Sequence, residues 1–109
     1  MWLAGEIRTP PFTREARIET GVLLRRLQRG DSLGMPAMRP MPSVGRRCAE
    51  LRVPDESQSW RIMLRVDPDA IVILDVFSKK TRTTQKKVIE ASKRRLRRYD
   101  ETASGRGQE

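Results

Sequence analysis

The sequence predicts an α+β fold in which an N-terminal helix and a C-terminal helix pack on a small antiparallel sheet. Three observations predict it. Residues 59–81 have the pattern of a β-hairpin, residues 46–53 alternate as a further strand, and the apolar residues of 14–29 and 85–99 recur at helical spacing. The short links between the strands favour an antiparallel meander. A chain of 109 residues allows one domain with a small core.

The first helix is expected from about Arg14 to Arg29. Thr13 is placed to cap its first turn, where Glu15 complements the helix dipole, and Gly30 is placed to end it. The residues expected to face the core are Ala16, Val22, Leu23 and Leu27, with Ile18 and Leu24 broadening the stripe.

Asp31 to Gly45 is expected to be a long loop, because it holds three prolines and two glycines. Its methionines recur every third residue and are expected to cover the core: Met35, Met38 and Met41. Arg46 to Val53 then reads as the first strand of the sheet. One side of this strand carries Ala49, Leu51 and Val53, and the other carries Cys48, Glu50 and Arg52.

The hairpin has one apolar side and one side with two arginines. In the first arm, Trp60, Ile62, Leu64 and Val66 alternate with Ser59, Arg61, Met63 and Arg65. Asp67-Pro68-Asp69 supplies the turn. The second arm, Ala70 to Phe77, is almost wholly apolar, as expected of a strand covered on both faces, and Lys79 and Lys80 follow it.

The last helix is expected from about Gln85 to Tyr99, capped by Thr83 or Thr84. The side expected to dock on the sheet carries Val88, Ile89, Ser92, Leu96 and Tyr99. The opposite side is cationic, with Lys86, Lys87, Lys93, Arg94, Arg95, Arg97 and Arg98. Residues 1–100 are expected to form the single domain, and residues 101–109 a disordered tail.

The net charge of +9 points to nucleic acid, an anionic membrane surface or an acidic protein as the partner. Arginine outnumbers lysine by 18 to 5, which suits phosphate recognition but is equally expected from an Arg-rich codon bias. A single cysteine and no histidine exclude an internal disulfide and a Cys/His zinc site, and no metal or other cofactor is expected. No apolar run has the length of a membrane span and the N-terminus lacks the pattern of a secretion signal, so we expect a cytoplasmic protein.

A candidate site follows from the alternation alone. If the face carrying Arg61 and Arg65 coincides with the face carrying Arg52, three arginines line one groove, and Lys79 and Lys80 close its edge. The alternative is a solvated polar face on which Glu50 and Asp75 pair the arginines. For Arg65 alone this alternative is favoured. For Arg52, Arg61 and the two lysines a phosphate site is favoured, largely because of the resemblance described next.

These segments carry a family resemblance. GEIRTPPFTREARIETGVLLRRLQRG, RPMPSVGRRCAELRV and WRIMLRVDPDAIVILDVFSKKT, followed by a basic helix, closely resemble the phage-derived, HigB-like branch of the RelE/ParE toxin superfamily. The resemblance covers roughly residues 3 to 100. It implies a curved sheet and the toxin half of a type II toxin–antitoxin pair. HigB-like members are ribosome-dependent mRNA endoribonucleases, and a helix-turn-helix antitoxin of the HigA-like kind neutralises them.

The resemblance also implies roles for named residues. Arg52 and Arg61 match the basic groove of the family, and Phe77, Lys79 and Lys80 match its F-x-KK strand end. We expect the 2′-OH of RNA to attack the adjacent phosphate, with Arg61, Lys79 and Lys80 as catalytic residues. The residues expected to contact messenger or ribosomal RNA are Arg52, Arg65, Phe77, Arg82, Lys86, Lys87 and Arg94.

Two points stay open from the sequence. Relatives place a Tyr or His near the site, but this chain has no histidine and its one tyrosine, Tyr99, ends the last helix, so the general acid and base are unassigned. Phe77 could stack on a base or belong to the core. The alternative functions are a non-catalytic ParE-like topoisomerase inhibitor, a decayed prophage toxin that only binds its antitoxin, and a simple RNA-binding module built on the basic helix.

Overall fold

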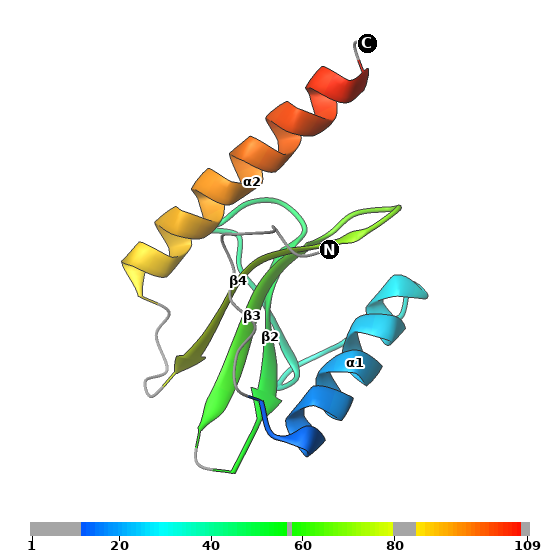
Figure 1. Ribbon diagram of the computed structural model, residues 1–109, viewed down its shortest axis with the longest axis vertical. Helices are drawn as coiled ribbons and strands as arrows, with labels where there is room; N and C mark the ends of the chain where they lie inside the picture. The colour runs from blue at the N-terminus through cyan, green and yellow to red at the C-terminus, as the bar shows by residue number, and fades with distance from the viewer. Residues whose placement is uncertain (1–11, 57, 80–84, 108–109) are drawn as a thin grey trace.

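The computed structural model of the chain describes residues 12–56, 58–79 and 85–107. The elements follow in the order α1 (Arg14–Gln28), β1 (Met38–Pro40), β2 (Cys48–Pro54), β3 (Ser59–Val66), β4 (Ile71–Lys79) and α2 (Lys86–Gly107). The strands form one antiparallel sheet in the order β1-β2-β3-β4 (Figure 1). The predicted α+β class and antiparallel meander are confirmed.

The sheet separates the two helices, and each face has its own core (Figure 1). On the α1 side, the apolar residues of β2 and β3 pack with Ala16, Leu23 and Leu27. On the α2 side, Met63, Val72 and Leu74 pack with residues of α2. The side chains of β2 and β3 therefore alternate as predicted, and the apolar side of both strands faces α1. β4 contributes buried residues to both cores, as expected of a strand covered on both faces.

α1 begins and ends where the sequence predicts. The Thr13 hydroxyl accepts a hydrogen bond from the Ala16 amide at 3.2 Å, and Gly30 follows the helix with a φ of +93°. The predicted apolar stripe is wrong at two positions, because Ile18 and Val22 are 56% and 40% exposed. The sheet contacts only a narrow strip of α1, so these outer residues have no layer to pack against.

The prediction of a continuous loop over residues 31–45 is wrong at β1. Met38, Arg39 and Pro40 pair with Leu51, Glu50 and Ala49 and make a short edge strand. The three methionines differ in burial: Met41 is buried, Met38 is half-buried, and Met35 is exposed. The expected cover over the core is therefore confirmed for Met41 and Met38 and wrong for Met35.

α2 packs on the sheet through the predicted residues. Val88 and Ser92 are buried, and Ile89, Leu96 and Tyr99 lie against the core of that face. The helix continues to Gly107, so residues 101–107 are helical where a disordered tail was expected. The predicted caps Thr83 and Thr84 lie outside the described residues. Within the described part of the chain, no helix is both long enough and apolar enough to cross a membrane.

Candidate anion-binding site

Arg52 and Arg61 lie directly opposite each other on neighbouring strands. The antiparallel register of β2 and β3 makes them partners, and it pairs Glu50 with Met63 and Cys48 with Arg65. Because Cys48 and Met63 belong to the core beneath α2, the whole set lies on the α2 side of the sheet. The prediction that the two arginine-bearing faces coincide is confirmed.

A buried carboxylate lies beside this arginine pair. Glu50 has no exposed surface, and its Oε1 atom lies 3.4 Å from Arg61 Nε and 3.7 Å from Arg52 Nε. Like charges opposite each other in a sheet repel, and the carboxylate offsets that repulsion. We call Glu50, Arg52 and Arg61 the arginine site. Its formal charge is +1, so it retains attraction for an anion.

The two guanidinium groups are largely removed from water. The exposed fractions of the side chains are 24% for Arg52 and 12% for Arg61. Burial lowers the pKa of Arg61, Glu50 opposes this shift, and Arg52 adds to it. Arginine nevertheless stays charged in proteins, and charges act more strongly where water is excluded. The site is thus suited to hold one phosphate group.

Hydrogen-bonding capacity remains at the arginine site. Neither Arg52 Nε nor Arg61 Nε has a hydrogen-bond partner in the described part of the structure, although both atoms are buried. Arg61 Nη1 donates to the Ser59 hydroxyl. An anion would have to be bound by terminal amino groups, because the two Nε atoms are buried and lie against Glu50.

The end of β4 borders the site. Phe77 is the register partner of Arg61, and Lys79 is the partner of Ser59. Phe77 is half-buried and packs against the core beneath α2. The backbone of Lys79 therefore lies two residues beyond the Arg61 position along the sheet, at the edge of the site where it was predicted. The side chain of Lys79, and the whole of Lys80 and Arg82, lie outside what the structure describes.

Arg65 has a different environment from the other two arginines. Its guanidinium forms bidentate contacts with Asp67, at 2.7 and 2.9 Å, and with Asp100 of α2, at 3.0 and 2.8 Å. The hydrogen bonds that Arg65 donates to Asp100, and then those that it donates to Asp67, raise the pKa of Arg65. Arg65 is thus paired, as the sequence favoured, but its partners are Asp67 and Asp100 and not the expected Glu50 and Asp75, and it is buried where a solvated face was expected. Asp100 lies 35 residues away in the chain, so no local pattern predicts it.

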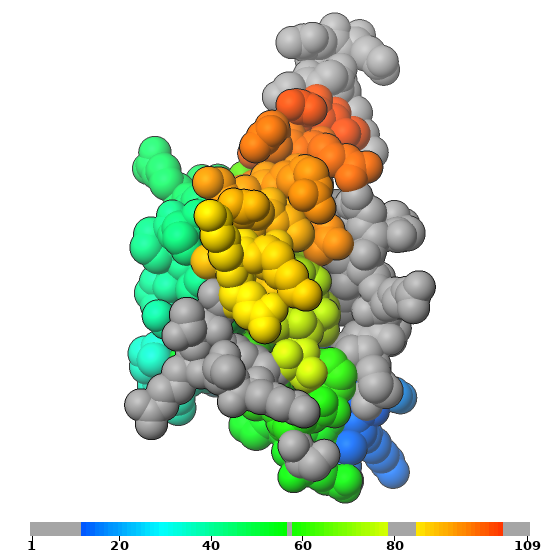
Figure 2. Space-filling model, turned by 90° about the vertical axis from the view of Figure 1, so that its left-hand side faces the viewer, coloured from blue at the N-terminus to red at the C-terminus, as the bar shows by residue number. Residues whose placement is uncertain are grey.

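The cations of α2 lie on the same side of the molecule as the arginine site. Lys86, Lys87 and Arg94 are exposed, as expected, and Lys93, Arg94 and Arg97 surround a polar surface hollow together with Glu90. Figure 2 shows the surface of α2 adjoining that of β4. Arg95 was expected on the cationic side of the last helix that faces away from the sheet, but the structure places it against β4. It is half-buried, lies 3.3 Å from Asp75 and donates to the Leu74 carbonyl at 2.9 Å.

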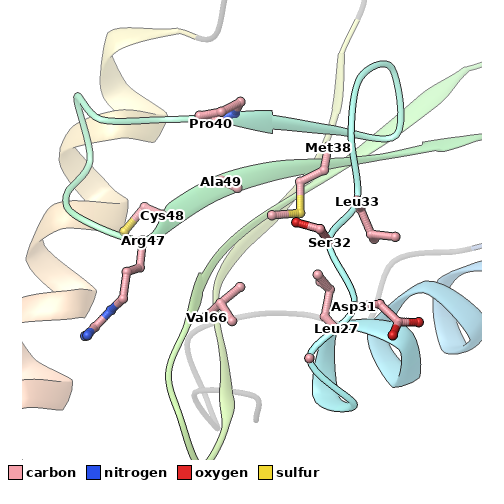
Figure 3. Close-up of a pocket in the computed structure, with 11 residues that line it drawn as sticks. Leu27, Asp31, Ser32, Leu33, Met38, Pro40, Arg47, Cys48, Ala49 and Val66 are labelled. Atoms are coloured by element: carbon pink, nitrogen blue, oxygen red, sulfur yellow. The ribbon is translucent and has the colours of Figure 1, made fainter.

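A second cavity lies at the opposite end of α1 from Thr13. It has a volume of about 440 Å³, and Figure 3 shows apolar side chains such as Leu27, Met38 and Val66 directed into it. The described lining includes the cationic side chain of Arg47, which contacts Asp67 at 3.3 Å. Converging cations are absent from its lining among the described residues, so this cavity lacks the chemistry of a phosphate site. The described residues also include no group of His, Cys, Asp and Glu arranged to hold a metal ion.

A protein-family model matches most of the chain. The model described as "Phage derived protein Gp49-like (DUF891)" matches residues 11–97, a range that includes α1, the whole sheet and most of α2. No curated protein and no solved structure matches the chain. The matched range contains all three residues of the arginine site.

Proposed function

The chain belongs to the phage-derived Gp49-like family of the RelE/ParE-like toxin superfamily, and from this premise we propose that it is the toxin of a type II toxin–antitoxin pair. We propose further that it is a HigB-like endoribonuclease that cleaves mRNA on the ribosome and so stops translation. The arginine site is the observation that supports this proposal most directly. Two desolvated guanidiniums at one point of a rigid sheet are an arrangement that binds and polarises a phosphodiester.

The proposed reaction uses the nucleophile that RNA carries. The 2′-hydroxyl gives up its proton to a base and its oxygen forms a bond to the adjacent phosphorus. The bond from phosphorus to the 5′-oxygen breaks and that oxygen takes up a proton from an acid, so the products end in a 2′,3′-cyclic phosphate and a 5′-hydroxyl. Arg52 and Arg61 hold the phosphate and stabilise the charge that builds on its oxygens. Lys79 and Lys80 supply cations at the strand end, and one of them carries a proton, since neighbouring cations lower the pKa of a lysine.

Contact with the ribosome is assigned to α2. Its exposed cations, with Lys86, Lys87 and Arg94 among them, lie on the same side of the sheet as the arginine site and can contact the phosphates of ribosomal RNA. Such contacts carry no base specificity, but they fix the orientation of the protein on a large RNA. With this orientation fixed, the arginine site contacts the mRNA at one defined position along the strand.

The partner that controls the toxin is proposed to be a helix-turn-helix antitoxin of the HigA-like kind. It would cover the arginine site with an acidic segment, because a +9 chain attracts acidic surfaces and a covered site cannot bind RNA. Charge reversal with Arg61→Glu and Lys80→Glu is expected to weaken the complex at least tenfold in a titration. Unchanged affinity would contradict this mode of inhibition.

Induced expression in a bacterial host tests the proposed function. The wild type should arrest growth and create new mRNA ends, detected by primer extension, whereas a folded Arg61→Ala/Lys80→Ala variant should do neither. Arg25→Ala is the matched control, since Arg25 is an exposed cation on α1, across the sheet from the site. Arrest without new ends would indicate another target, such as a topoisomerase. Absence of arrest would indicate a chain that only binds its partner.

A further inference from the structure

The Oε1 atom of Glu50 lies close to both arginines of the site. Oε1 lies within 3.4 Å of Arg61 Nε and within 3.7 Å of Arg52 Nε, while the carboxylate itself has no exposed surface. Both contacts are made at the Nε edge of the guanidinium. Among the terminal amino groups, Arg61 Nη1 donates to the Ser59 hydroxyl, and an anion would be bound by the others, on the side of each arginine that faces away from Glu50.

The three charges depend on one another. A buried carboxylate is unfavourable unless it is paired, and two guanidiniums at partner positions of a sheet repel each other. Placing one carboxylate between the two arginines offsets both costs. Loss of the carboxylate charge would leave the arginines without the contact that fixes their directions.

We propose that Glu50 is the positioning residue of the arginine site: it holds Arg52 and Arg61 by their Nε edges so that both guanidiniums present their terminal amino groups to one phosphate. This inference deepens the proposed function and rests on it for the identity of the anion. Glu50 has no exposed surface through which a substrate could touch it, so it acts through the arginines.

The same sheet face offers a matched control pair. Asp75 on β4 lies 3.3 Å from Arg95, and Arg95 also donates to the Leu74 carbonyl. Asp75 is thus a half-buried carboxylate beside an arginine on the same side of the sheet, but it lies outside the arginine site. Asp75→Asn removes a comparable charge without disturbing Arg52 or Arg61.

The first arm of the test needs no enzymatic activity. In ¹⁵N spectra of the purified protein, the Nε–Hε signals of Arg52 and Arg61 should shift and exchange faster with water in Glu50→Gln than in the wild type. Asp75→Asn should leave both signals in place and move that of Arg95. If Glu50→Gln leaves the Arg52 and Arg61 signals unchanged, Glu50 does not position them and the inference is overturned.

The second arm measures cleavage of ribosome-bound mRNA. Glu50→Gln should lower kcat about 100-fold, because the arginines lose their alignment, and should leave KM within about threefold. Asp75→Asn should keep the wild-type kcat. A large loss of kcat with unchanged arginine signals would show that Glu50 takes part in the chemistry itself, and this result also overturns the inference.

Glu50→Asp separates position from charge and covers the case in which Glu50→Gln does not fold. This substitution keeps the negative charge but shortens the side chain by one methylene, which moves the carboxylate away from the two arginines. Positioning predicts shifted Nε–Hε signals and a loss of kcat of about tenfold or more, whereas a role in charge balance alone predicts wild-type behaviour. If the wild type cleaves no RNA, the proposed function fails, and the Nε–Hε signals during titration with a non-cleavable 2′-O-methyl oligonucleotide still decide the role of Glu50.

Discussion

Asp55 joins the start of α1 to the turn between β2 and β3. Its carboxylate accepts hydrogen bonds from the Thr13 hydroxyl at 2.6 Å, the Thr13 amide at 3.3 Å, the Glu56 amide at 2.8 Å and the Trp60 indole at 3.0 Å. The bond from the Thr13 hydroxyl contributes most to lowering the pKa of Asp55 to about 2. One side chain therefore links a helix cap to the core residue Trp60.

The lowered pKa predicts a pH dependence of stability. The ionised form of Asp55 is favoured in the folded state, so its contribution is present above the ordinary value of 3.8 and is lost as the pH falls toward 2. Urea unfolding between pH 2 and pH 5 should show a smaller loss of stability at low pH for Asp55→Asn than for the wild type. Asp69→Asn, in the exposed hairpin turn, is the control and should follow the wild type. Parallel profiles for wild type and Asp55→Asn would contradict the assignment.

The arginines show what a sequence can and cannot predict at the residue scale. Period-two alternation is a property of the backbone, so the shared face of Arg52 and Arg61 follows from the sequence once both strands are recognised. Glu50 is visible as a possible partner for the same reason. The partner of Arg65 depends instead on where α2 crosses the sheet, which tertiary packing decides.

At the scale of elements, Arg65 fixes α2 to the hairpin. It joins Asp67, at the end of β3, to Asp100 in α2, and its guanidinium lies 5.9 Å from the centre of the Tyr99 ring. The Asp67 side chain is 10% exposed and that of Asp100 is 51% exposed. The contact with Asp67 should therefore contribute more to stability than the contact with Asp100.

This difference predicts unequal effects of two substitutions. Arg65→Ala should lower the free energy of unfolding by about 2 kcal/mol, because the largely buried Asp67 carboxylate loses its nearest cation and keeps the more distant and more exposed Arg47. Asp100→Asn should lower it by about 1 kcal/mol or less, because that carboxylate is half in water. Urea denaturation measures both, with Arg94→Ala on the exposed side of α2 as a control within about 0.5 kcal/mol of the wild type. Equal losses for the two variants would contradict the larger contribution of the contact between Arg65 and Asp67.

Elements with a local signal were predictable, and elements that depend on distant partners were not. The Thr13 cap, the Gly30 stop and the hairpin all follow from residues adjacent in the chain. β1 has three residues and includes Pro40, and it becomes a strand because β2 offers an edge to pair with. Ile18 and Val22 are exposed because the sheet under α1 is too narrow to cover them. The helical spacing of apolar residues carries no information on the width of that sheet.

At the scale of the whole molecule, the sheet divides the surface into two sides. The arginine site and the exposed cations of α2 share one side, and α1 covers the other (Figure 1). A polyanion that enters the arginine site can therefore continue along α2. Neutralising charges on α2 should weaken RNA binding in a way that depends on salt.

The salt dependence can be predicted for two α2 arginines. Replacing Arg94 and Arg97 with alanine removes two phosphate contacts, so the slope of log K against log salt concentration should fall in magnitude by about 1.4. Fluorescence anisotropy with a non-cleavable single-stranded RNA between 50 and 200 mM salt measures this slope. Arg17→Ala/Arg25→Ala, which changes two exposed cations of α1, should keep the wild-type slope. The same slope for all three proteins would exclude α2 as an RNA-binding surface.

The most direct test of the central claim is single-turnover cleavage of a defined mRNA on purified ribosomes by the wild type and by Arg61→Ala. We predict products that end in a 2′,3′-cyclic phosphate and a 5′-hydroxyl, and a rate about 10²- to 10³-fold lower for the folded variant, the loss expected when one group that stabilises the transition state is removed. No cleavage by the wild type, or cleavage at the same rate by Arg61→Ala, would contradict a ribonuclease built on the arginine site.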